Sequence, residues 1–170
     1  IRNIDIESFN AETIEILYPK SQGLNGLEEA LDNIIIQIEK ALERKTNIII
    51  LSDRGVNQEF APIPALLACS YVNHQMNRLR KRSYFDIIIE SAEPREPHHF
   101  ATLFGYGASA INPYMVNEII RMQVKEGFIT DMNEQEAVDN FNFAIGKGIL
   151  KVMNKIGIST LHSYRGSQIF

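Results

Sequence analysis

Apolar and polar positions follow two different rhythms along the chain, and these rhythms predict strands and helices in turn. Residues 12–18 ("ETIEILY") alternate as in a strand, which Pro19 ends because proline cannot donate a ladder hydrogen bond. The runs "NIIILS" at 47–52 and "DIIIES" at 86–91 have unbroken apolar centres, which indicates strands covered on both faces. Shorter strands are predicted at 108–114 ("ASAINPY") and 158–164 ("ISTLHSY").

Helical spacing of apolar residues fills the intervals between these strands. It is clearest at 23–45 and 63–82, and a shorter helix is predicted at 98–107. Two more helices follow residue 114, and the second runs from Asn133, with Glu136 as its capping-box partner, to a glycine cap at Gly157. Strands that alternate with helices predict an α/β fold with a mostly parallel sheet, either a partial barrel or a doubly wound sheet.

Composition narrows the class of protein. The 170 residues predict one domain over 1–170, and 45% hydrophobic residues are enough for a sizeable core. A net charge of −4 argues against nucleic acid as a partner, and no apolar run reaches the ~18 residues of a membrane span. The single cysteine, Cys69, fits a reducing compartment and predicts a cytoplasmic protein. Because the chain opens at Ile1 and stops at Phe170 without a polar tail, we expect a piece of a longer protein.

Polar residues follow three of the predicted strands. They are Ser52, Asp53 and Arg54 after the first apolar run, Glu90 after the second, and Asn112 before Pro113 and Tyr114. Function in parallel α/β sheets collects at the carboxyl ends of strands, so one interpretation is a rim that holds a small polar ligand. The other is that these groups cap helices and pair with one another, since buried polar groups need partners.

Other candidate chemistry is weaker. The adjacent His98 and His99 would point about 100° apart on a helix, whereas helical two-histidine metal sites use i, i+4 spacing, so a capping or packing role is favoured. The "GYG" at 105–107 follows a helix and precedes a strand, which is the reverse of a phosphate loop. Cys69 lies among apolar helix residues, a setting typical of an inert thiol.

Two features of the helix surfaces have alternative interpretations. The basic cluster at 78–82 ("RLRKR") is either a solvated helix end or a contact for an acidic partner. Gly146 and Gly148 flank Lys147 inside a long helix, where each glycine costs about 1 kcal/mol relative to alanine. This pair predicts a close backbone contact, with a neighbouring domain as the candidate partner.

The chain resembles the central domain of the glutamate synthase large chain. The resemblance rests on "LSDRG" (51–55), "IPALLA" (63–68), "HHFATLFGYGASAINPY" (98–114), "NFNFAIGKGILKVMNKIGISTLHSYRGSQIF" (140–170) and, near the start, "GLEEALD" (26–32). These strings keep their order and cover most of the chain; the match is weakest at 115–135.

The resemblance implies a parent enzyme that makes two glutamates from glutamine and 2-oxoglutarate, with electrons from NAD(P)H or ferredoxin. It implies that this domain joins a glutamine amidotransferase domain to an FMN-binding synthase domain and helps to wall an ammonia tunnel. The FMN and the iron–sulfur cluster of the parent are expected outside this chain, so that no catalytic, cofactor or metal residue is assigned here. The matching framework residues are implied to be structural or to face other domains: Ser52, Asp53, Arg54, Gly55, His98, His99, Gly105, Gly107, Asn112, Pro113, Lys147, Gly148, Ser163, Tyr164 and Gly166.

We therefore expect the isolated chain to be inactive, and to self-associate if surface that other domains cover is exposed. The alternative is a free-standing α/β domain that binds a ligand or acts as an enzyme at the rim of Asp53, Arg54, Glu90 and Asn112.

Overall fold

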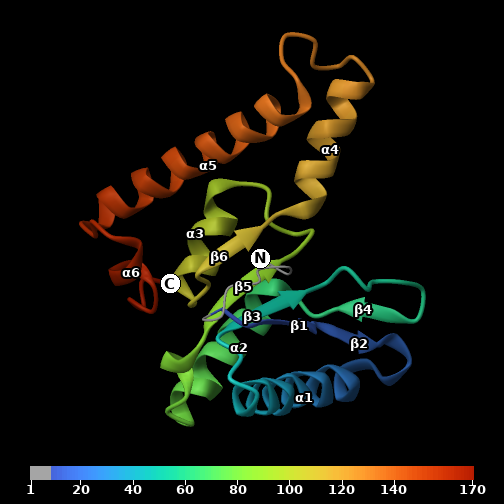
Figure 1. The fold of residues 1–170 in the computed structure, drawn as a ribbon, viewed down its shortest axis with the longest axis vertical. Coiled ribbons are helices and arrows are strands. Elements are labelled where there is room, and N and C mark those ends of the chain that lie inside the picture. Colours follow the sequence, from blue (N-terminus) through green and yellow to red (C-terminus); the bar gives the residue numbers. More distant parts are fainter. Residues whose placement is uncertain (1–8) are drawn as a thin grey trace.

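Four parallel strands, paired in chain order, form the sheet at the centre of the molecule (Figure 1). The computed structural model describes residues 9–170. The strands are β1 (Ala11–Glu15), β3 (Ile48–Ser52), β5 (Asp86–Glu90) and β6 (Ala110–Asn112), in the order β1-β3-β5-β6. The predicted α/β class and parallel sheet are confirmed. This order has no reversal, and a doubly wound sheet reverses at its switch point, so the observed strands match the partial barrel of the two predicted arrangements.

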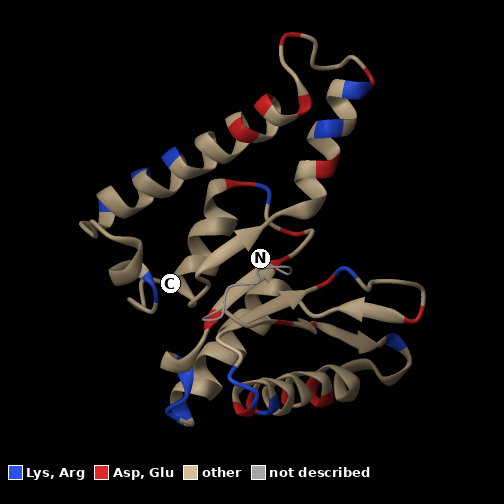
Figure 2. Cartoon of the chain, viewed as in Figure 1, with Lys and Arg blue, Asp and Glu red and all other residues tan. Residues whose placement is uncertain are grey.

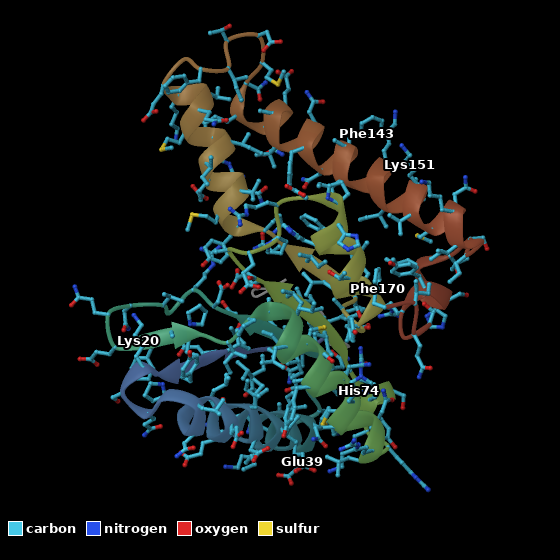
Figure 3. The ribbon with its side chains drawn as sticks, turned by 180° about the vertical axis from the view of Figure 1, so that it is seen from behind. Lys20, Glu39, His74, Phe143, Lys151 and Phe170 are labelled. Atoms are coloured by element: carbon cyan, nitrogen blue, oxygen red, sulfur yellow. The ribbon has the colours of Figure 1, made fainter. Side chains whose placement is uncertain are left out.

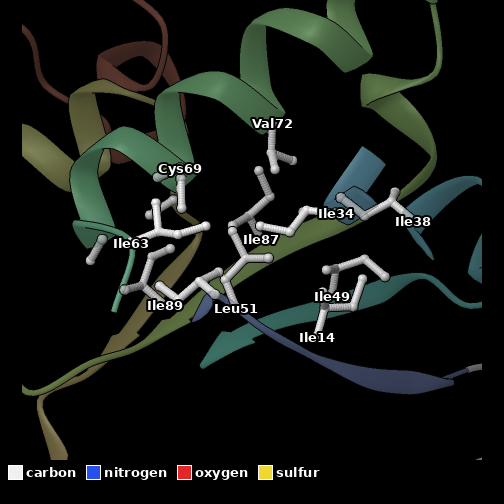
Figure 4. Close-up of a cluster of buried hydrophobic side chains, with 14 of the residues drawn as sticks. Ile14, Ile34, Ile38, Ile49, Leu51, Ile63, Cys69, Val72, Ile87 and Ile89 are labelled. Carbon is white, nitrogen blue, oxygen red and sulfur yellow. The ribbon is translucent and has the colours of Figure 1, made fainter. Parts of the chain in front are cut away.

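Three helices connect the strands and cover one face of this sheet. They are α1 (Gly23–Glu43), α2 (Ala65–Arg78) and α3 (Pro97–Gly105). In register, Ile14, Leu51, Ile89 and Ile111 form one layer across all four strands, and the first three are almost fully buried. Side chains of α1 and α2 close over this face, as Figure 4 shows for Ile34, Ile38, Cys69 and Val72. The hydrophobic core therefore lies between the sheet and these helices.

The first predicted strand is in fact two. The chain bends at the buried Ile16, and β2 (Leu17–Pro19) pairs antiparallel with β4 (Phe60–Pro62), outside the main sheet. This short pair is fixed by residues more than 40 positions apart, which no local pattern reveals.

The carboxyl-terminal third is helical and projects from the α/β body (Figure 1). Helix α4 (Tyr114–Lys125) leads into α5 (Glu134–Ile156), which packs against α4 and α3. The predicted caps of α5 are confirmed: the Asn133 side chain accepts from the backbone N–H groups of Gln135 and Glu136, and Gly157 is left-handed with φ 75°.

The predicted strand at 158–164 is wrong. A loop leads there into the short helix α6 (Leu161–Tyr164), which Thr160 caps by accepting from the backbone N–H of Ser163 at 3.2 Å. Thr160 thus serves as a helix cap and not as a strand residue. Among residues 9–170, every helix is too short or too polar to span a lipid bilayer.

Candidate functional site

The carboxyl ends of the four strands carry a polar layer on the face opposite the core. Glu15, Ser52, Glu90 and Asn112 lie in register, one residue beyond the buried apolar layer. Side chains alternate between the two faces of a strand, so a polar residue directly after a buried one points to the other side. The structure therefore brings Ser52, Glu90 and Asn112 together, as the three polar strand ends predict.

Glu90 is the centre of this layer. Its carboxylate accepts from Ser52 Oγ at 2.7 Å and from Asn112 Nδ2 at 3.2 Å, and it forms an ion pair with Arg54 Nε at 3.0 Å. The Glu90 side chain is only 7% exposed, whereas that of Arg54 is 45% exposed. Among residues 9–170, donors from three segments thus partner this buried carboxylate, as burial of a charge requires.

Asp53 forms a second cluster beside the first. It accepts from Ser91 Oγ at 2.6 Å, from the backbone N–H of Ala92 at 3.0 Å and from the Tyr114 hydroxyl at 2.8 Å. Burial and the hydrogen bond to Asp53 raise the pKa of Tyr114 to about 12. Tyr114 is therefore a neutral donor at physiological pH.

Arg54 connects the two clusters. Its guanidinium carbon lies 4.0 Å from the centroid of the Tyr114 ring, while its Nε is paired with Glu90. Both carboxylates, Asp53 and Glu90, are thus occupied by donors of this chain. An arrangement of this kind fixes the ends of three strands relative to one another, and it leaves little carboxylate capacity for general-base chemistry.

The two adjacent histidines have separate structural roles. His99 Nδ1 accepts from the backbone N–H groups of Arg95 at 3.1 Å and Glu96 at 3.3 Å, which caps the start of α3. The His98 ring instead meets the Phe170 ring edge-on, with centroids 5.8 Å apart. Within residues 9–170, no group of three or more His, Cys, Asp or Glu side chains is placed to hold a metal ion.

Comparison with known proteins decides the family. A family model described as "Glutamate synthase central domain" matches residues 1–170. The chain belongs to this family.

The relatives of this chain are much longer proteins. The chain is 40% identical to the glutamate synthase [NADPH] large chain of Bacillus subtilis, and the match covers 100% of the chain and 11% of that protein. It is 39% identical to glutamate synthase [NADH] of Schizosaccharomyces pombe (100% and 8%) and 35% identical to a ferredoxin-dependent glutamate synthase of Pyropia yezoensis (92% and 11%). The chain thus spans about a tenth of the length of these relatives, and the resemblance seen in the sequence is confirmed.

A solved structure shares the fold of the central domain. A mutant flavocytochrome b2 with pyruvate bound aligns with a TM-score of 0.56 at 12% identity, over 94% of this chain and 47% of that one. At this identity the likeness concerns the fold alone.

Lys147 and Tyr164, the remaining predicted residues, lie on other elements of the central domain. Lys147 is exposed on α5, with its Nζ 4.4 Å from the centroid of the Phe143 ring. Tyr164 is fully buried in α6, and its hydroxyl donates to the carbonyl oxygen of Ala101 at 3.0 Å. Tyr164 therefore anchors the carboxyl-terminal segment on α3.

The basic cluster and the cysteine are both built into the fold. Arg82 donates to Asn73 Oδ1 and to the carbonyl oxygens of Phe85 and Gly107, all within 2.9 Å. Lys81 pairs with Glu39 at 2.6 Å, so part of the cluster is already neutralised within the chain. Burial raises the pKa of the Cys69 thiol to about 12, which keeps it protonated and a poor nucleophile.

Two cavities lie near the ends of the sheet. One, of about 360 Å³, is on the carboxyl side and is lined in part by Glu93 of the loop after β5 and by the capping His99 of α3. A larger one, of about 830 Å³, is at the opposite edge, lined in part by Asp86, Arg82 and Arg165. Arg165 and Ser109 both contact the Asp86 carboxylate, and the Ser109 hydrogen bond followed by Arg165 lowers the Asp86 pKa.

Sequence reasoning missed one residue of the polar layer, Glu15, and the partners of Asp53. Ser91 and Tyr114 were recognised as polar residues of the strand ends, but nothing local shows that both reach Asp53. Glu15 was missed because the predicted strand at 12–18 ends too late. Had the break at Ile16 been recognised, Glu15 would have been the fourth polar strand end.

Proposed function

We propose that this chain is the connecting module of a glutamate synthase large chain, joining a glutamine amidotransferase domain to an FMN-binding synthase domain. In this proposal it helps to wall the tunnel that carries ammonia between them, and the parent enzyme makes two glutamates from glutamine and 2-oxoglutarate. The observation that carries the proposal is family membership combined with a rim whose carboxylates, Asp53 and Glu90, are engaged inside the chain.

The chemistry of the available side chains supports a structural role. Amide hydrolysis by an amidotransferase of the cysteine type needs a reactive thiol, and Cys69 is buried with a raised pKa. An iron–sulfur cluster needs several cysteine ligands, and the sequence has one cysteine. The residues present do not fit that cluster, so we place the cluster and the FMN of the parent in its other domains.

Relatives named for three different electron donors, NADPH, NADH and ferredoxin, all match the chain at 35–40% identity. A connecting module that takes no part in electron transfer is expected to be shared among all three.

The test is to assay the purified chain for glutaminase activity, for glutamate formation from 2-oxoglutarate and ammonia, and for flavin absorbance. A full-length glutamate synthase measured in parallel is the positive control. We expect no turnover above buffer and no visible absorbance from the chain. Stoichiometric flavin or clear turnover would overturn the structural role.

A second candidate function is ligand binding at the rim, and Arg54 is the observation that favours it. Its half-exposed guanidinium is held by Glu90 and Tyr114, so it could meet a carboxylate from solvent. This candidate predicts that 2-oxoglutarate or glutamate raises the unfolding temperature, as any ligand of the native state does. Arg54→Gln is expected to abolish that rise, and its absence in the unmodified chain argues for the connecting role alone.

A further inference from the structure

Helix α5 has one face that packs inside the fold and one that does not. Ala137, Val138, Ile145 and Met153 are buried against the rest of the domain. On the outer face, Phe143 and Leu150 are each 63% exposed, seven residues apart and thus on nearly the same side of the helix. Figure 3 shows Phe143 and Lys151 on this outer side. Exposed apolar side chains at this spacing are typical of a helix that takes a second helix as its partner.

Gly146 lies between Phe143 and Leu150 on the outer face, and its missing side chain leaves a notch there. Gly148 is accounted for within the fold, since a Cβ there would lie 2.5 Å from Pro97 Cβ. For Gly146, nothing in the described residues lies within 4 Å of such a Cβ, so packing within them does not require a glycine. Glycine lowers helix stability, and a helical glycine that faces open space is expected where another backbone or a large side chain approaches closely.

Charge is divided along the same helix. The acidic residues Glu136 and Asp139 precede Phe143, whereas Lys147, Lys151 and Lys155 follow it, as Figure 2 shows by its red and blue ends of α5. A helix with opposite charges at its two ends is complementary to a second copy of itself that runs antiparallel. A parallel copy would place like charges side by side.

We propose that α5 pairs with α5 of a second copy of this chain, antiparallel, about a two-fold axis between Ala144 and Ile145. Residues at equal distances from this axis then lie opposite each other. Phe143 of each copy covers Gly146 of the other, and Asp139 stands opposite Leu150. Glu136 comes opposite Met153, between Lys151 and Lys155 of the other copy, so each acidic half meets a basic half. The same surface is used twice, as a two-fold interface requires.

The seam has the spacing of a coiled coil. Asp139, Phe143, Gly146 and Leu150 are separated by four, three and four residues, which is the alternation of core positions in a heptad. In this seam the Phe143 ring is the knob and the missing side chain of Gly146 is the hole. The proposal thus accounts together for the exposed aromatic ring, the glycine and the charge order, and it does not depend on the proposed connecting function.

The first experiment measures the mass of the chain by sedimentation velocity over a concentration series. We expect a monomer–dimer equilibrium in which Phe143→Glu raises the dissociation constant about tenfold or more, since aromatic anchors dominate such interfaces. Phe128→Glu is the matched control, because Phe128 is 78% exposed but lies in the loop between α4 and α5. Circular dichroism verifies that both variants keep their helices.

A second experiment tests the register by disulfide trapping. The double variant Asp139→Cys, Leu150→Cys is expected to form a covalent dimer under mild oxidation, because these positions face each other in the antiparallel pair. Leu150→Cys alone is expected not to, although a parallel pair would cross-link there. The native Cys69 is buried and gives little background. A chain that stays monomeric at all concentrations, a dimer unaffected by Phe143→Glu, or cross-linking by Leu150→Cys alone would each overturn the proposal.

Discussion

Replacement of Glu90 is the sharpest probe of the polar layer. The carboxylate is buried and accepts from Ser52, Asn112 and Arg54. Within the described residues, Glu90→Ala removes two hydrogen bonds and an ion pair at once, and it leaves Ser52, which is 2% exposed, without its acceptor. A single unsatisfied buried group costs about 1–3 kcal/mol, and breaking a buried ion pair costs about 3–5 kcal/mol. Because Arg54 is half exposed and can regain water, we expect a total loss of about 3–4 kcal/mol.

Glu90→Gln separates the charge from the geometry. The amide oxygen can still accept from Arg54 and Asn112, and the Ser52 hydroxyl can rotate to accept from the new amide N–H. Only the charge-assisted part of the Arg54 contact is lost, so we expect a cost of about 1–2 kcal/mol.

Urea unfolding followed by circular dichroism measures the free energy of unfolding of both variants, and thermal unfolding gives a second measure. The loss of free energy for Glu90→Ala corresponds to a fall in melting temperature of about 6–16 °C for a domain of this size, and that for Glu90→Gln to about 2–8 °C. The slope of the denaturation curve should be unchanged, which shows that the denatured state is comparable. A loss below about 1 kcal/mol for Glu90→Ala, or a larger loss for Glu90→Gln than for Glu90→Ala, would refute the view that these hydrogen bonds hold the strand ends together.

Three further predictions concern the helices and the titrating groups. Gly148→Val should lower the free energy of unfolding by about 1–3 kcal/mol or more because its side chain clashes with Pro97, whereas Gly146→Ala should raise that of the monomer by up to about 1 kcal/mol. Urea unfolding at a concentration where the chain is monomeric measures both, and equal effects would contradict the packing described. Cys69, with its pKa of about 12, should react with a thiol reagent at pH 8 only as fast as the chain unfolds, and rapid labelling of the native state would contradict its burial. The stabilisation that accompanies the raised pKa of Tyr114 is fully present below pH ~10 and is lost as the pH rises towards about 12. The difference in unfolding free energy between the native chain and Tyr114→Phe should therefore be constant up to about pH 9 and shrink above about pH 10, and a difference that grows with pH would contradict this linkage.

Local patterns were sufficient for the elements whose determinants are local. The apolar runs of β3 and β5 are buried, as their composition indicates. The ends of α5 follow from Asn133 and Gly157, because caps act within a few residues of the helix they end. The segment 158–164 was misassigned because a strand needs a neighbouring strand, and a sequence pattern does not show whether one is free.

The residues of the polar layer could largely be predicted from the sequence, but their hydrogen-bond partners could not. Polar residues after buried strands identified Ser52, Glu90 and Asn112, since parallel strands end at the same edge. Which donor meets which carboxylate depends on contacts between segments about 20 to 60 residues apart, and so the hydrogen bond from Tyr114 to Asp53 could not be assigned. The outer face of α5 is different, because its residues follow from helical spacing in the sequence once the buried side of the helix is known.

The chain-order pairing of the main sheet has a consequence for how the molecule can be made. Each of β3, β5 and β6 joins the strand that emerged immediately before it in that sheet, at an edge that is still open. No strand has to be inserted between two that are already paired, so assembly can keep pace with a ribosome from the amino terminus onward. The exposed edge strand stays unpaired only until the next connecting helix and strand have been synthesised. This limits the time during which its backbone can pair with other nascent chains.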